Sequence, residues 1–63
     1  MTNKAEILNQ MAQVRAINCV DTAYEFLNKL VEAGMEFPNA ESRVLSHFTG
    51  IAQEDLANIY DQL

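Results

Sequence analysis

Glycine and proline are confined to three positions in this chain, Gly34, Pro38 and Gly50. These two residues are the ones that helix interiors tolerate least, so their placement leaves long stretches free to be helical. Within those stretches apolar residues recur at spacings of three and four, which is the period of a helix with one buried face. Strand-like alternation of apolar and polar residues is not found. The sequence therefore predicts an all-α fold of three to four short helices.

The first predicted helix covers about residues 3–16. Asn3 stands at its start, with Glu6 three residues later, and this pair is a relative of the capping box that satisfies the free N–H groups of a first turn. The helix then carries a stripe of apolar residues on one face. These residues are Ile7, Leu8, Met11 and Val14.

The second predicted helix begins near residue 22 and ends at Gly34. Asp21 or Thr22 is the expected cap at its start, and Thr22 with Glu25 completes a Thr-x-x-Glu capping box. A glycine just beyond the last turn is typical of a left-handed residue that closes a helix. The apolar face of this helix consists of Ala23, Phe26, Leu27, Leu30 and Val31.

Two arrangements fit the rest of the chain. Pro38 suits the first turn of a third helix, and Gly50 is a natural stop before a fourth helix over residues 51–63. An interior glycine costs a helix only about 1 kcal/mol, however, so one longer helix through Gly50 is the alternative. The apolar face of the last segment is formed by Leu56, Ile59, Tyr60 and Leu63.

We expect the 63 residues to form a single helical interaction domain, 1–63, and a core of this size is marginal without further support. Cys19 is the only cysteine and His47 the only histidine, so neither a disulfide nor a Cys/His zinc site can supply that support. Hydrophobic residues nevertheless make up 49% of the chain. We therefore expect self-association as a homodimer or completion by a partner chain, the alternative being that these residues fill a monomeric core.

Charge and hydropathy exclude several functions. Four Lys and Arg against nine Asp and Glu give a net charge of −5, and the four cations are widely spaced, so direct nucleic-acid binding is not expected. No apolar run approaches the ~20 residues that span a membrane, and no secretory segment is recognisable. The expected location is the cytoplasm, with no membrane association.

Catalytic chemistry has few candidate residues here. Cys19 and His47 are the one potential nucleophile and base, although a small apolar residue and a partly exposed histidine describe them equally well. Glu54 and Asp55 are adjacent and point about 100° apart on a helix, which suits an N-terminal turn better than a metal site. We expect no enzyme, no metal and no cofactor.

Residues 5–32 carry short motifs that resemble known proteins. Ile7-Leu8-Asn9, Val14-Arg15-Ala16 and Cys19-Val20-Asp21-Thr22 resemble the N-terminal dimerisation region of the nucleoid protein H-NS. The Arg-Ala-Ile and Val-Asp-Thr steps also resemble the small Hha/YmoA regulators, helical partners of H-NS. The resemblance implies a small regulator that binds the oligomerisation region of an H-NS-like protein, either as a co-regulator or as an antagonist.

The expected interaction surface joins the apolar stripes of the first two helices with the residues between them. Its residues are Ile7, Leu8, Met11, Val14, Arg15, Val20, Phe26, Leu27 and Leu30. The alternative is a phage or mobile-element inhibitor of an unrelated host protein or regulator, in which clustered carboxylates replace nucleic-acid phosphates. The carboxylates in question are Glu32, Glu36, Glu41, Glu54, Asp55 and Asp61.

Overall fold

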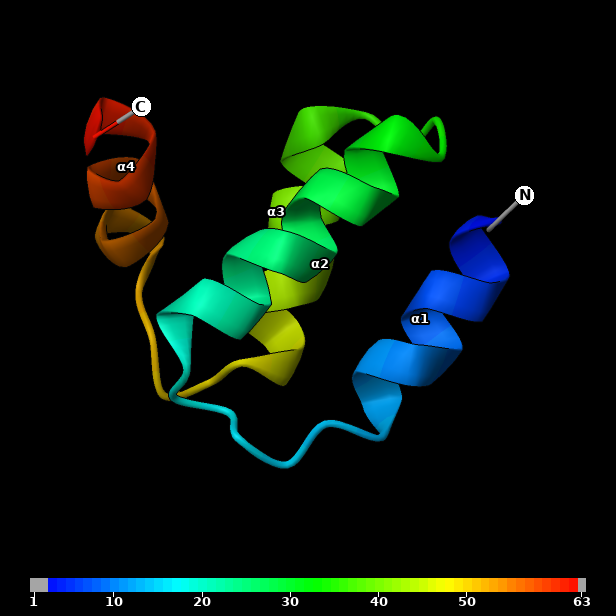
Figure 1. The fold of residues 1–63 in the computed structure, drawn as a ribbon, viewed down its shortest axis with the longest axis horizontal. Helices are drawn as coiled ribbons and strands as arrows, with labels where there is room; N and C mark the ends of the chain where they lie inside the picture. Colours follow the sequence, from blue (N-terminus) through cyan, green and yellow to red (C-terminus); the bar gives the residue numbers. More distant parts are fainter. Residues whose placement is uncertain (1–2, 63) are drawn as a thin grey trace.

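A computed structural model describes residues 3–62, except for the side chains of Tyr60 and Gln62. It contains four helices: α1 (Lys4–Ala12), α2 (Val20–Glu32), α3 (Phe37–His47) and α4 (Gln53–Gln62) (Figure 1). The described residues form no strand, and the predicted all-α fold is confirmed. The contributions expected of Leu63 and of the Tyr60 side chain lie outside the described part.

The start of α1 is the predicted one, but its end is not. The Asn3 side chain accepts a hydrogen bond from the Glu6 N–H at 2.8 Å, which is the expected cap. The helix ends at Ala12, four residues earlier than predicted, because the N–H groups of Gln13 and Val14 bond to carbonyls three residues back. Hydrogen bonds that span three residues instead of four tighten and close the last turn of a helix. Residues 13–19 then form a connection that contains turns at Gln13 and at Ile17 and Asn18.

Helix α2 begins at Val20, two residues before the predicted start, and Cys19 occupies the capping position. The predicted cap at Asp21 or Thr22 is wrong, since both residues lie inside the helix and the Thr22 hydroxyl donates to Cys19 Sγ at 3.2 Å. The predicted end is confirmed: Gly34 has a φ of +103°. The N–H of Gly34 bonds to the Val31 carbonyl and that of Met35 to the Leu30 carbonyl, which is the Schellman pattern.

Gly50 separates α3 from α4, so the chain forms two helices here rather than one. The chain leaves the helix at Phe48, and residues 49–52 form a connection that meets the one after α1. The Gly50 N–H donates to the Ile17 carbonyl at 3.2 Å, and a Cβ on Gly50 would lie 2.8 Å from Asn18 Cβ. Glycine is needed at this position because the two connections approach each other so closely.

Helix α2 is the centre of the packing, and α1, α3 and α4 each pack against it (Figure 1). The Phe26 and Phe48 rings lie 6.3 Å apart at its middle. Every helix contributes to one continuous core, which the chain closes by itself. The buried residues are Ile7, Met11, Ala23, Phe26, Leu27, Leu30, Ala40, Val44, Phe48 and Leu56.

The longest helix, α2, has 13 residues. Among the described residues, no helix has the length and apolar character needed to cross a bilayer.

Candidate protein-binding groove

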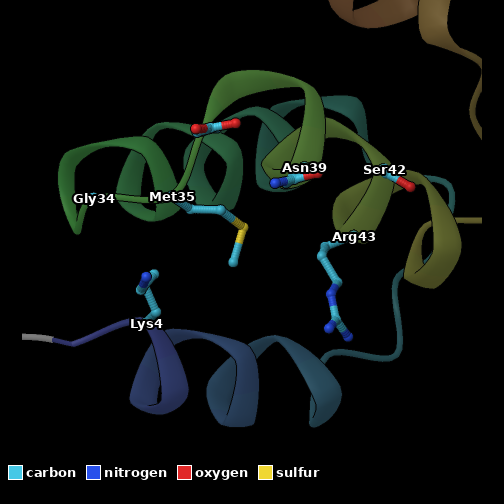
Figure 2. Close-up of a pocket in the computed structure, with 7 residues that line it drawn as sticks. Lys4, Gly34, Met35, Asn39, Ser42 and Arg43 are labelled. Carbon is cyan, nitrogen blue, oxygen red and sulfur yellow. The ribbon is translucent and has the colours of Figure 1, made fainter.

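A groove runs between α1 and α3. Both helices pack on α2 but make few direct contacts with each other, which leaves space between them. One hollow of about 500 Å³ lies beside Lys4 and the turn from α2 to α3, and a second of about 300 Å³ lies beside Leu8 and His47. Arg43 lines both hollows, so we treat them as one feature, the α1–α3 groove. Figure 2 shows the hollow beside Lys4.

The floor of the groove is apolar. Leu8 and Met11 lie one turn apart on α1 and therefore share a face. Met11 is buried and Leu8 is half-buried, so Leu8 is the more accessible of the two. Met35, placed by the Schellman turn after α2, points from the opposite side toward α1 (Figure 2).

Two cationic side chains extend into the groove. Arg43 reaches from α3 toward α1, and Lys4 rises from α1 toward the turn between α2 and α3 (Figure 2). Within residues 3–62 neither of them forms an ion pair, and Glu36 is the one carboxylate residue among those lining the groove. An acidic chain thus places two of its four basic residues in one groove.

Polar residues complete the α3 side of the groove. Asn39, Ser42 and Ser46 line it at successive turns of the helix, and they provide hydroxyl and amide groups beside Arg43. These groups both donate and accept hydrogen bonds. The α3 side is therefore polar and cationic, whereas the floor facing it is apolar.

His47 links α3 to the chain just after α1 at one end of the groove. Its Nε2 lies 2.8 Å from the carbonyl oxygen of Val14, and because a carbonyl only accepts, Nε2 carries the hydrogen. The same ring meets the Phe48 ring edge-on at 5.1 Å. The bond links the chain just after α1 to the last turn of α3, and it therefore helps to set the separation of the two groove walls.

Most of the interaction surface expected from the sequence is used for folding. Five of its nine residues are buried in the chain's own core, so a partner does not reach them in the folded monomer; they are Ile7, Met11, Phe26, Leu27 and Leu30. Leu8 lines the groove, while Val14 and Val20 are half-buried and Arg15 is exposed outside it. Lys4 and Arg43, which sequence reasoning did not include, come together only through the packing of α1 and α3 on α2.

Cys19 and His47 have separate partners. The hydroxyl of Thr22, donating to Cys19 Sγ, lowers the pKa of the Cys19 thiol. His47 bonds to Val14, and in the described part of the chain no hydrogen bond joins the histidine to the cysteine. Among those same residues no three His, Cys, Asp or Glu side chains gather to hold a metal ion.

The six carboxylates considered for nucleic-acid mimicry are distributed over α2, α3, α4 and the turn before α3. Two of them have structural roles. Asp55 accepts from the Ala52 N–H at 2.8 Å at the start of α4, and Glu41 accepts from the Gln53 side chain at 2.9 Å. The hydrogen bonds of Asp55 and Glu41 therefore serve the fold.

Comparison with protein-family models, curated proteins and solved structures finds no match for this chain.

Proposed function

We propose that this protein is a small helical regulator that acts by binding another protein in its α1–α3 groove. The observation that carries this proposal is the groove itself, an apolar floor beside two cations that form no ion pair within residues 3–62, on a chain that buries its own core. Concave sites with an apolar floor and a few polar groups are the usual form of binding sites. No comparable arrangement of catalytic side chains competes with it in the described residues.

The partner we propose is the oligomerisation region of an H-NS-like nucleoid protein. The motifs at Ile7-Leu8-Asn9 and Val14-Arg15-Ala16 support this choice, and Leu8 is the residue of the first motif that also lines the groove. By occupying that region the protein would modulate silencing, either joining the partner's filament or breaking it. Neither role requires this chain to bind DNA, in keeping with its charge of −5.

Self-association stays a prediction, and fewer exposed apolar residues support it than the composition of the chain suggests. Ten of the apolar residues in the described part of the chain are buried in the monomer's core, and others are half-buried against it. The large apolar side chains still exposed among the described residues are Ile17, Val31 and Phe37, at 41%, 39% and 42%. Sedimentation of the purified protein tests this point, since a homodimer that persists on dilution supports it and a 7 kDa monomer contradicts it.

Calorimetric titration into the purified oligomerisation region of an H-NS-like protein tests the proposed function. The wild-type chain is compared with Leu8→Asp, which places a carboxylate on the groove floor, and with Gln10→Asp, an exposed position of the same helix outside the groove. We expect wild type and Gln10→Asp to bind alike and Leu8→Asp to bind at least about tenfold more weakly, because the new carboxylate removes the apolar contact of Leu8 and pairs with Arg43, which lines the same hollow.

Circular dichroism must show that all three proteins are folded. No heat of binding from the folded wild-type chain would rule out the proposed partner. Equal affinity of Leu8→Asp and wild type would place the binding surface outside the groove.

A further inference from the structure

The charge of the groove differs from that of the chain as a whole. The protein carries a net −5, yet Lys4 and Arg43 extend into one groove, and within residues 3–62 neither has a carboxylate partner. Lys29, by comparison, lies on α2 with its ammonium 5.3 Å from the centre of the Phe26 ring. The two groove cations are thus free to meet an anionic group supplied by another molecule.

The groove also selects for apolar side chains next to that anionic group. Leu8 and Met11 form the floor below Arg43, and Met35 lies near Lys4 at the other end. Methionine side chains are flexible and polarisable, and they adapt to apolar groups of different shapes. A ligand that covers both the cations and the floor must therefore combine carboxylates with apolar side chains.

Nucleic acid fits these features less well than an acidic peptide does. Binding to a phosphate backbone needs several clustered cations, whereas this groove has two and the remainder of the surface is acidic. Inorganic phosphate would meet the cations but leave Leu8 and Met35 in water. An acidic peptide with one apolar face satisfies both sides of the groove.

We propose that the α1–α3 groove binds an acidic amphipathic peptide segment of a partner protein, with one carboxylate at Arg43, a second near Lys4, and apolar side chains on the half-buried Leu8 and Met35. Arginine pairs with carboxylates through two parallel hydrogen bonds, so Arg43 is the main determinant of specificity. The proposal rests on the proposed function in taking this groove as a protein-binding site, and it adds the chemistry of the bound segment.

The test uses three short helical peptides that share leucines at every third or fourth position and carry Glu, Gln or Lys elsewhere. Binding to the isotope-labelled full chain is followed by NMR through the Arg43 Nε–H group and the methyl groups of Leu8, Met11 and Met35. We expect the Glu peptide to shift these signals and to bind about tenfold more tightly than the Gln peptide. The Lys peptide should leave them unchanged.

Two variants with the same change of net charge distinguish an effect of the groove from an effect of the protein's overall electrostatic field. Arg43→Glu should weaken binding of the Glu peptide about tenfold, whereas Lys29→Glu, on exposed α2 surface away from the groove, should change it less than about twofold. Equal effects of the two variants, equal affinity for the Glu and Gln peptides, or no shifts at millimolar peptide would each overturn the proposal.

Competition and sedimentation test whether nucleic acid or a second copy of this chain occupies the groove instead. A single-stranded oligonucleotide that displaces the Glu peptide at lower concentration, or a homodimer that Arg43→Glu dissociates, would assign the groove to nucleic acid or to a second copy and refute the peptide proposal. The proposed H-NS-like partner and the proposed acidic segment can be refuted separately. Glu-peptide binding without binding to the H-NS-like region would refute only that partner, and the converse would refute only the acidic segment.

Discussion

Replacing Leu30 by alanine tests whether this residue, which the sequence placed in the interaction surface, belongs to the core instead. Leu30 is 0% exposed, and a buried Leu→Ala change costs about 2–5 kcal/mol through lost transfer energy and the cavity left behind. A 63-residue chain has a free energy of unfolding of about 3–9 kcal/mol at typical values per residue. Leu30→Ala should therefore remove a large part of the stability. Leu8→Ala, at a half-buried position, should cost about 1 kcal/mol.

Urea unfolding followed by circular dichroism measures both free energies of unfolding. We expect Leu30→Ala to unfold at a clearly lower urea concentration than wild type, and Leu8→Ala to stay close to wild type while binding its partner more weakly. A Leu30→Ala protein with wild-type stability and lost partner binding would refute the assignment of Leu30 to the core. It would instead support the interface expected from the sequence.

Three further predictions concern single contacts. Gly50→Ala should lower the free energy of unfolding by about 1–3 kcal/mol, because its Cβ would meet Asn18, and Asn18→Gly in the same chain should recover part of that loss in urea titrations. Asn3→Ala should cost about 0.5–2 kcal/mol and speed amide hydrogen exchange in the first turn of α1, whereas unchanged exchange would contradict the cap. The Thr22 hydroxyl lowers the pKa of the Cys19 thiol in the folded chain. The free energy of unfolding should therefore rise with pH between the thiol pKa of the folded chain and that of the unfolded chain, and this gain is lost as pH falls through the pKa of the folded chain. Thr22→Val should raise the thiol pKa measured by thiolate absorbance, and an unchanged titration would refute the role of that hydrogen bond.

Local signals in the sequence predicted the helix ends that depend on neighbouring residues. Asn3 caps α1, Pro38 lies in the first turn of α3 and Gly34 closes α2, because each acts through the backbone within a few residues of itself. The break at Gly50 was open from sequence. It depends on the approach of Asn18, more than thirty residues away.

The groove was beyond sequence reasoning for the same physical reason. Periodicity identifies an apolar face but does not say whether that face meets the chain's own helices or another protein, and Phe26 and Leu27 turn out to pack internally. Lys4 and Arg43 belong to different helices and carry no motif. Only the docking of α1 and α3 on α2 places them together.

The most direct test of groove binding is an NMR shift map of the full chain with the purified oligomerisation region of an H-NS-like protein added. We expect the largest changes at Leu8, Arg43 and Ser46, with the signals of buried Leu27 little affected. Changes confined to the connection around Ile17, or to the exposed side of α2, with the groove signals unmoved, would contradict the proposed site.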